Sequence, residues 1–203
     1  MKILVLGSTG LLGQALVKEI GSVGHETVGV ARRAADVNLD LTNESGLKKL
    51  LLDVKPDWVI NAAAVVNLKT CEEDASAWLI NVGLPGMLSR WCTELSIPWV
   101  QVSTDHYFSG DEKSRHSESD SVELLNAYAR QKYAAEALAR VCERALVLRV
   151  NIVGYRGWGQ PTFVEWALDS LHHRKPMFLF SDYFISSLDV GSCSSWILGL
   201  IEK

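Results

Sequence analysis

Short apolar runs alternate along the chain with longer segments in which apolar residues recur every three or four positions. This alternation is typical of β–α–β units, in which parallel strands form one sheet and the intervening helices cover its faces. We therefore expect an α/β fold. The apolar runs predict strands at Lys2–Leu6, Glu26–Val30, Trp58–Asn61, Trp99–Ser103, Ala145–Val150 and Met177–Phe180. The periodic segments predict helices at Leu11–Ile20, Glu44–Leu52, Asp74–Asn81, Pro85–Leu95, Ala127–Glu143, Phe163–His172 and Asp189–Ile201.

Two irregular segments interrupt this pattern. Residues Phe108–Glu123 are rich in Ser, Asp and Glu without periodicity, and Gly154–Gly159 contains three glycines. Each follows a predicted strand, so both would leave the sheet at the carboxyl ends of its strands, where open α/β sheets bind ligands. Long loops in compact domains are usually functional, and we expect these two to border a binding site.

The composition is that of an ordinary globular protein, since 48% of the 203 residues are hydrophobic and 22% are charged. The net charge of −4 is not concentrated in runs of one sign, so we expect neither nucleic acid nor a membrane as a partner. No stretch approaches the roughly 18 apolar residues of a membrane span. The four cysteines are far apart and form no C-x-x-C pattern, which favours a reducing compartment over a zinc site. We expect a cytoplasmic protein without a bound metal.

A glycine-rich segment, Gly7-Ser8-Thr9-Gly10-Leu11-Leu12-Gly13, follows the first predicted strand directly and opens the first predicted helix. In this context the glycines indicate the dinucleotide-binding turn of a Rossmann-type, doubly wound parallel sheet. The first glycine permits a tight turn, the second lets the main chain approach a pyrophosphate, and the third lets helix and strand pack closely. The helix start offers N–H groups to the phosphates. We expect cofactor contacts from Gly7, Thr9, Gly10, Leu11, Leu12 and Gly13.

The residues after the second predicted strand bear on the choice of cofactor. NAD-binding units carry an acidic residue there that binds the ribose hydroxyls. This chain instead reads Ala31-Arg32-Arg33, and two guanidinium groups suit the 2′-phosphate of NADP. We therefore predict NADP as the cofactor, with Arg32 and Arg33 on its phosphate. The alternative is an ordinary pair of surface arginines.

A candidate catalytic pair, Tyr128 and Lys132, lies on a predicted helix with a spacing that places both side chains on one face. Such a pair is common by itself, but here the glycine loop and a strand ending in Ser103 and Thr104 precede it. A hydroxyl, a phenol and an ammonium in this order indicate a reductase. Lys132 would lower the pKa of the phenol, and Tyr128 would pass a proton to a carbonyl oxygen while NADPH reduces the carbonyl carbon. We prefer Thr104 for the hydroxyl and keep Ser103 as its rival.

Two longer stretches resemble a known family. Residues 103–110, Ser-Thr-Asp-His-Tyr-Phe-Ser-Gly, and residues 126–136, Asn-Ala-Tyr-Ala-Arg-Gln-Lys-Tyr-Ala-Ala-Glu, are similar to segments of dTDP-4-dehydrorhamnose reductases. So is Asn61-Ala62-Ala63-Ala64. These reductases are extended short-chain dehydrogenases/reductases, and the resemblance covers roughly residues 1–150. It implies NADPH-dependent reduction of the 4-keto group of a nucleotide-linked deoxysugar, as in dTDP-rhamnose biosynthesis.

The resemblance also assigns roles to residues that no other pattern identifies. On the cofactor side it implies that an acidic and an apolar residue contact the adenine and that a run of small residues leaves room for the cofactor. On the substrate side it implies a carboxylate that positions the sugar. The residues concerned are Asp40 and Leu41 for the adenine, Ala62, Ala63 and Ala64 for the small run, Asp105 and Asn151 for the sugar, and Tyr128 and Lys132, which would also contact the cofactor.

The chain departs from this family's pattern at three places. The family's Trp soon after a strand arginine is missing from the segment that begins Arg149-Val150-Asn151, His106 replaces a usual Tyr, and residues 182–187 replace an Asp-Gln…Pro-Thr segment. The identity of the sugar therefore stays open. We expect an NADP-binding domain with the catalytic helix over residues 1–150. Residues 151–203 would begin a substrate-binding lobe, which is incomplete because the sequence stops before the family's C-terminal segment.

Two other functions stay open. An NAD-dependent sugar-nucleotide epimerase or dehydratase would share the glycine loop and the Tyr–Lys pair, but Arg32 and Arg33 disfavour it. A non-catalytic, cofactor-binding regulatory relative would fit the missing lobe, but the intact Thr104, Tyr128 and Lys132 disfavour that reading. A homodimer is compatible with each of these functions.

Overall fold

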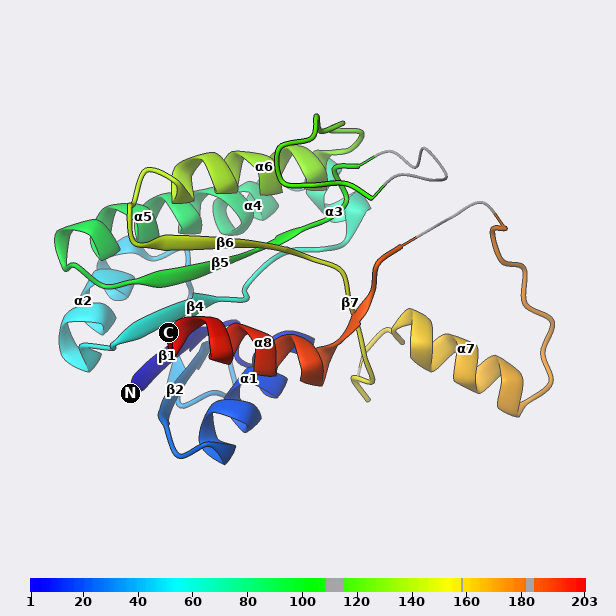
Figure 1. Cartoon of the computed structure of the whole chain (residues 1–203), viewed down its shortest axis with the longest axis horizontal. Helices are drawn as coiled ribbons and strands as arrows, with labels where there is room; N and C mark the ends of the chain where they lie inside the picture. The colour runs from blue at the N-terminus through cyan, green and yellow to red at the C-terminus, as the bar shows by residue number, and fades with distance from the viewer. Residues whose placement is uncertain (109–114, 158, 182–184) are drawn as a thin grey trace.

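The sheet has six parallel strands in the order β3-β2-β1-β4-β5-β6 (Figure 1). The structure, a computed structural model, describes residues 1–108, 115–157, 159–181 and 185–203. This strand order is that of a Rossmann-type sheet, which confirms the predicted fold class. The strands of this sheet are β1 (Lys2–Leu6), β2 (Glu26–Ala31), β3 (Val37–Asn38), β4 (Trp58–Asn61), β5 (Trp99–Thr104) and β6 (Ala145–Val150). A second sheet has two strands, β7 (Ile152–Val153) and β8 (Leu188–Asp189).

Helices cover both faces of the large sheet (Figure 1). On one face lie α1 (Leu11–Ser22) and α8 (Val190–Ile201), and on the other α2 (Glu44–Val54), α5 (Leu84–Glu94) and α6 (Ala127–Ala139). Between β4 and α5 the chain forms α3 (Leu68–Glu73), α4 (Ala75–Trp78) and a π-helical turn, η1 (Leu79–Gly83), and α7 (Phe163–His172) follows β7. None of the helices in the described ranges is long and apolar enough to span a bilayer.

Alternate residues of β1 supply the two halves of the core. Leu4 and Leu6 lie in a cluster of buried side chains with residues of α2 and α5. Ile3 and Val5 lie in a second cluster, with residues of α1 and α8. A parallel strand that is covered on both faces must be apolar at nearly every position, which explains why β1 reads as one continuous apolar run.

The predicted strand at Met177–Phe180 is wrong. These residues have no regular secondary structure and belong to neither sheet. Phe178 is 92% exposed and Phe180 is 85% exposed. An apolar run of four residues fits a strand by composition, but only pairing with a neighbouring strand satisfies its backbone groups.

Other differences concern short elements and helix bounds. The apolar pattern did not predict β3, β7 and β8, which have two residues each, nor α3, which is largely polar. The predicted helix at Asp74–Asn81 is divided between α4 and η1. The helix predicted over Ala127–Glu143 ends at Ala139, because the chain turns there and the N–H of Cys142 bonds the carbonyl of Ala139 before β6 begins.

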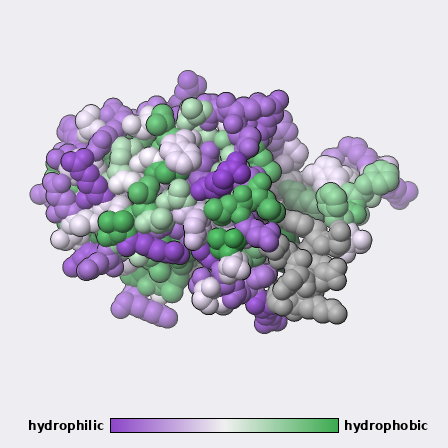
Figure 2. Space-filling view, turned by 90° about the horizontal axis from the view of Figure 1, so that it is seen from above, coloured by the Kyte–Doolittle hydropathy of each residue, from purple (hydrophilic) through white to green (hydrophobic). Residues whose placement is uncertain are grey.

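Helix α7 and the segment that follows it project from the body of the molecule as an arm (Figure 1). Apolar surface is visible on this arm in Figure 2. The exposed apolar side chains of the arm include Phe163, Trp166, Leu168, Leu171, Phe178, Leu179 and Phe180. Its start is fixed by a capping box, in which Thr162 and Glu165 each accept a hydrogen bond from the other's backbone N–H.

The turn after β1 is packed so tightly that two of its glycines have no room for a side chain. Gly7 adopts a φ of +78°, and a Cβ there would lie 2.8 Å from the Cα of Ala63. A Cβ on Gly13 would lie 2.1 Å from the carbonyl oxygen of Gly7. The start of α1 therefore contacts the turn backbone to backbone, which is the close approach that the glycine pattern predicts.

Two alanine substitutions in α1 test this packing. Gly13→Ala should lower the free energy of unfolding by about 1–3 kcal/mol or more, because its methyl group meets backbone atoms that cannot move aside. Gly21→Ala should raise it by about 0.5–1 kcal/mol, because a Cβ at Gly21 meets no atom within 4 Å and alanine favours a helix. Urea unfolding followed by circular dichroism measures both. Equal effects of the two substitutions would contradict the close packing at Gly13.

Candidate active site

The N-terminus of α1 can bind an anion. Gly10 is the N-cap residue, and among the described residues no side chain caps the helix, so its first N–H groups remain available. Within the described residues the hydroxyl of Ser8 is buried without a hydrogen-bond partner. The N–H groups of Gly7 and Ser8 donate to the carbonyl of Val30 at 2.8 and 3.1 Å, which holds the turn against β2. A turn closed to side chains, free donors and an unsatisfied hydroxyl together fit the pyrophosphate of a dinucleotide.

The other predicted contacts of this turn differ in what they can offer. Thr9 is half-buried, and its carbonyl accepts a hydrogen bond from the side chain of Gln14 at 3.1 Å. Leu11 is also half-buried and lies beside Gly154. Leu12 packs in the core with a 5% exposed side chain, so it has only its backbone to offer a cofactor.

Arg32 and Arg33 extend from the end of β2 and are exposed. Neither forms an ion pair with another described residue. A carboxylate that the sequence pattern did not indicate lies near them: Asp36 accepts a hydrogen bond from the N–H of Gly29 at 2.8 Å. The two arginines are thus free to bind an anion, whereas Asp36 is engaged by the backbone of β2.

The residues predicted to contact the adenine lie just beyond β3. Asp40 is exposed and accepts hydrogen bonds from the backbone N–H and the hydroxyl of Thr42 at 3.0 and 2.8 Å. These bonds, together with the charge of Arg32, hold the pKa of Asp40 below its usual value. Leu41 is 5% exposed and packs in the core. Of this pair, only Asp40 presents its side chain to solvent.

The run of small residues leaves β4 next to the glycine turn. Ala62, Ala63 and Ala64 are half-buried, and Ala63 is the residue that Gly7 approaches. The following residue, Val65, exchanges two hydrogen bonds with the side-chain amide of Asn81 in η1, at 2.8 and 2.9 Å.

Asn81 also links this loop to α6. Its amide nitrogen donates to the side chain of Gln131 at 2.7 Å, and Gln131 in turn donates to the carbonyl of Cys71 at 3.0 Å. The π-helical turn places Asn81 where it reaches both segments. No local pattern in the sequence indicated this contact, since its partners are far apart along the chain.

The three predicted catalytic side chains come together at the carboxyl end of β5. The phenol of Tyr128 lies close enough to Thr104 for that hydroxyl to lower its pKa, and Nζ of Lys132 donates to the carbonyl of Val102 at 2.6 Å. The hydroxyl of Thr104 also accepts a hydrogen bond from the N–H of His106 at 3.2 Å. Residues that are one turn apart on α6 thus reach positions two residues apart on β5.

Burial controls the protonation of Tyr128 and Lys132. It raises the pKa of Tyr128 to about 12, although the hydrogen bond with Thr104 opposes this rise. Burial also lowers the pKa of Lys132 to about 8, and the charge of Glu136 opposes that fall. The sequence led us to expect a phenol with a lowered pKa, and without a cofactor the structure gives the opposite direction. The phenol keeps its proton at neutral pH, which is the form that a proton donor needs.

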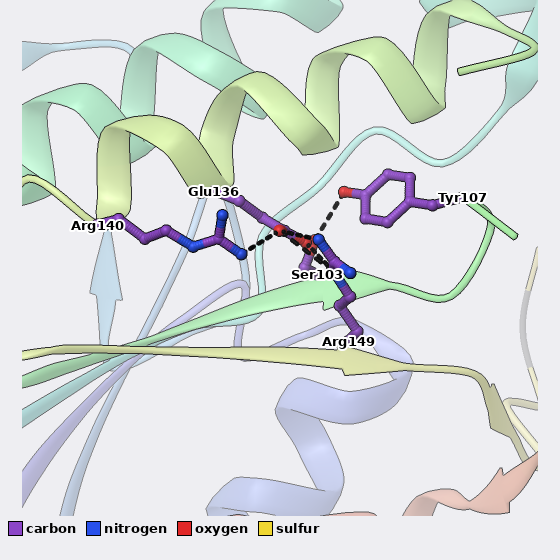
Figure 3. Close-up of polar contacts among 5 residues, drawn as sticks. All are labelled: Ser103, Tyr107, Glu136, Arg140 and Arg149. Carbon is purple, nitrogen blue, oxygen red and sulfur yellow. Dashed lines mark hydrogen bonds and ion pairs between the residues drawn. The ribbon is translucent and has the colours of Figure 1, made fainter. Parts of the chain in front are cut away.

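The rival hydroxyl, Ser103, lies in a different environment. It is 4% exposed and shares a hydrogen bond of 2.9 Å with the hydroxyl of Tyr107, on the side of β5 that faces Glu136 and Arg149 (Figure 3). Tyr107 is itself fully buried, and its burial raises the pKa of its phenol. Ser103 is therefore engaged in a buried cluster, whereas Thr104 meets Tyr128.

The two predicted substrate residues also meet. The side-chain amide of Asn151 donates to both carboxylate oxygens of Asp105, at 3.1 and 3.2 Å, and its oxygen accepts from the hydroxyl of Ser187 at 3.0 Å. Both Asp105 and Asn151 are half-buried. This pair lies directly beyond the ends of β5 and β6 and next to Thr104.

The two irregular segments are partly described. In the first, Phe108 stacks on His116 with ring centroids 4.6 Å apart, and residues 109–114 lie outside the described ranges. In the second, the carboxylate of Glu165 accepts hydrogen bonds from the N–H groups of Thr162, Gly157 and Arg156, which hold its pKa at about 2. Trp158 lies outside the described ranges, as do residues 182–184. Within them, no group of three or more His, Cys, Asp or Glu side chains could hold a metal ion.

Comparison with known proteins extends these observations. A family model described as the RmlD substrate binding domain matches residues 1–203. A probable low-salt glycan biosynthesis reductase of Haloferax volcanii is 29% identical, over 98% of this chain and 70% of that protein. A dTDP-4-dehydrorhamnose reductase of Burkholderia thailandensis is 32% identical, over 91% of this chain and 60% of that protein. The chain thus spans less than two thirds of the length of that reductase.

The fold has close counterparts among solved structures. The crystal structure of the dTDP-4-dehydrorhamnose reductase of Bacillus anthracis, in complex with NADP, matches all of this chain and 71% of its own, with a TM-score of 0.88. At 22% identity this likeness shows the fold alone. The family model covers every residue of the chain, and the two relatives named above are described as reductases. The chain therefore belongs to the RmlD substrate binding domain family, the family of the dTDP-4-dehydrorhamnose reductases.

Proposed function

We propose that the protein reduces the 4-keto group of a nucleotide-linked deoxysugar with NADPH, as a dTDP-4-dehydrorhamnose reductase does. The observation that carries this proposal is the meeting of Thr104, Tyr128 and Lys132 at the carboxyl end of β5. That edge of the sheet also holds the glycine turn, so a cofactor and a proton donor would face the same substrate. Residues 1–150 would bind the cofactor, and residues 151–203 would begin the substrate-binding region.

Each residue of the triad has a role that its environment supports. Tyr128 donates its proton to the carbonyl oxygen, since burial keeps the phenol protonated. Thr104, whose hydroxyl lies beside Tyr128 and acts on its pKa, donates to the same oxygen. Lys132 places a positive charge near the phenol, which stabilises the phenolate that remains after proton transfer.

The cofactor assignment depends on the glycine turn and the two arginines. When bound, NADPH supplies the hydride that reduces the carbonyl carbon. Its pyrophosphate fits the uncapped start of α1 and the turn around Gly7 and Gly10, and Arg32 and Arg33 are free to bind a 2′-phosphate. The NADP complex of the Bacillus anthracis reductase is consistent with this choice.

The substrate assignment depends on Asp105 and Asn151. A carboxylate held by an amide next to the catalytic hydroxyls suits the hydroxyl groups of a sugar, which donate to carboxylates and accept from amides. Family membership favours a nucleotide-linked deoxysugar with a ketone at C4. The test is to add dTDP-4-dehydrorhamnose and NADPH to the protein and to measure turnover as the loss of NADPH absorbance.

Replacing both arginines tests the cofactor. The wild-type protein should bind NADPH more tightly than NADH, because each charge-assisted hydrogen bond to the 2′-phosphate contributes roughly 1.5–3 kcal/mol before screening. Arg32→Ala with Arg33→Ala should remove this preference and leave the affinity for NADH nearly unchanged. Titration of both cofactors by fluorescence measures the ratio. Arg144→Ala, which changes an exposed arginine distant from β2, is the control. Equal wild-type affinities would refute the NADP assignment.

Removing one hydroxyl tests the proton donor. Tyr128→Phe should lower kcat by roughly 10²–10⁴-fold, as expected for loss of a general acid, while NADPH still binds. Tyr133→Phe, a half-buried tyrosine on the same helix, should retain wild-type turnover. Single-turnover kinetics with saturating NADPH separate chemistry from binding. A Tyr128→Phe enzyme with near wild-type turnover would exclude Tyr128 as the donor.

The pH dependence of turnover tests Lys132. Because burial lowers its pKa from 10.5 to about 8, the ammonium is present below pH 8 and is lost above it. The value of kcat/KM, which reports the free enzyme, should therefore fall as the pH rises through about 8. Lys132→Met should be slow at every pH and show no such fall. A wild-type profile that stays flat to pH 10 would show that the charge of Lys132 is not needed.

A further inference from the structure

Glu136 is a carboxylate with no exposed surface, located on α6 one turn beyond Lys132. Arg149 of β6 meets it with two nitrogens: its Nε lies 3.0 Å from one carboxylate oxygen, and a terminal nitrogen lies 2.9 Å from the other. Arg140, which is half-exposed, donates to Glu136 from the opposite side at 3.0 Å (Figure 3). Both oxygens of this buried carboxylate thus face guanidinium groups.

The spacing of α6 puts this carboxylate in line with the candidate catalytic residues. Tyr128, Lys132, Glu136 and Arg140 follow one another at intervals of four residues, so they share one face of the helix. Lys132 is 3% exposed, and the charge of Glu136 raises its pKa against the lowering effect of burial. An ammonium with so little solvent needs a nearby anion to keep its proton.

The other titratable groups around Lys132 do not supply that anion. Toward the start of α6 stands Tyr128, a neutral phenol with a raised pKa, and the buried thiol of Cys71 in α3 also has a raised pKa. After β5 come Tyr107, neutral and buried, and Asp105, whose carboxylate is engaged by Asn151. Among the other described charged groups of α6 and its neighbours, Glu72 of α3 pairs with Arg130 where both side chains are exposed, and the cations of Arg140 and Arg149 both bond Glu136.

We propose that Glu136 is a positioning residue, held in place by Arg149, that keeps the Lys132 side chain charged and directed at the carboxyl end of β5 beside Tyr128. The inference rests on the proposed function for the role of Lys132, and it adds a residue that does not itself touch substrate or cofactor. A purely structural role would not need a charge at this position, because apolar side chains of similar volume stabilise a buried site as well as an ion pair does. The carboxylate stands one helical turn from the buried ammonium of Lys132.

The test measures Lys132 directly, in the protein without cofactor or substrate. The pKa of Lys132 is followed by the pH dependence of its ¹³Cε signal in lysine-labelled protein, with Lys132→Met to assign that signal. In wild type the midpoint should lie near 8. In Glu136→Gln, which keeps the shape and removes the charge, it should fall by about 1 pH unit or more. In Glu136→Asp, which keeps the charge, it should return toward the wild-type value.

Two further variants control for folding and for loss of a hydrogen bond. Arg140→Gln removes a partner of the same carboxylate from its exposed side and should leave the midpoint of Lys132 unchanged. If Glu136→Gln does not fold, the double variant Glu136→Gln with Arg149→Gln removes both buried charges and leaves no unpaired ion. Its Lys132 midpoint should also fall, since Glu136 is the charged group that raises it.

An unchanged midpoint in folded Glu136→Gln, or in the double variant, would overturn the proposal. So would an equal fall in Glu136→Gln and Glu136→Asp, because that result would mean that packing and not charge is what Glu136 supplies. The readout does not depend on turnover, so failure of the proposed reductase activity would leave this measurement intact. Where turnover is detected, the alkaline fall of kcat/KM should move with the Lys132 midpoint in each variant.

Discussion

The carboxylate of Glu136 is buried on α6, and its charge is stable there because Arg149 of β6 meets it with two nitrogens. Since β6 pairs with β5 along its whole length, this contact fixes α6 at one height and rotation against β5. Tyr128 and Lys132 then reach Thr104 and the end of that strand. A helix that slid or turned would leave a buried charge without a partner, at a cost of about 3–5 kcal/mol. The placement of the candidate proton donor therefore depends on an ion pair outside the reacting atoms.

The strands of the large sheet could be predicted best where burial on both faces forces a continuous apolar run, as in β1. The same rule produced the wrong strand at Met177–Phe180, because composition carries no information about whether a pairing partner exists. The two-residue strand β3 is too short to leave a pattern, and it is fixed by its pairing with the end of β2. The predicted bounds of helices were wrong where tertiary contacts change the helix, as at the division of the predicted helix Asp74–Asn81 into α4 and η1.

The candidate site, too, could be predicted from the sequence only in part. The glycine turn and the Tyr128–Lys132 pair are local patterns, so their placement on a turn and on one helix face could be predicted. The contact of Asn81 with Val65 and the pairing of Glu136 with Arg149 join different secondary-structure elements, 16 and 13 residues apart in the chain. No spacing rule covers such contacts. The direction of the Tyr128 pKa was missed for a related reason, since burial depends on the whole fold.

The strand order has a consequence for how the protein emerges from the ribosome. Ile3 and Val5 are covered by α1 and by α8, and α8 comprises residues 190–201. Helix α1 is made early, but the part of this apolar face that α8 covers stays exposed until nearly all of residues 1–203 have been made. Contacts this far apart in sequence slow folding, and exposed apolar surface makes a folding intermediate prone to aggregation. The docking of α8 therefore completes the cover of this face of the sheet.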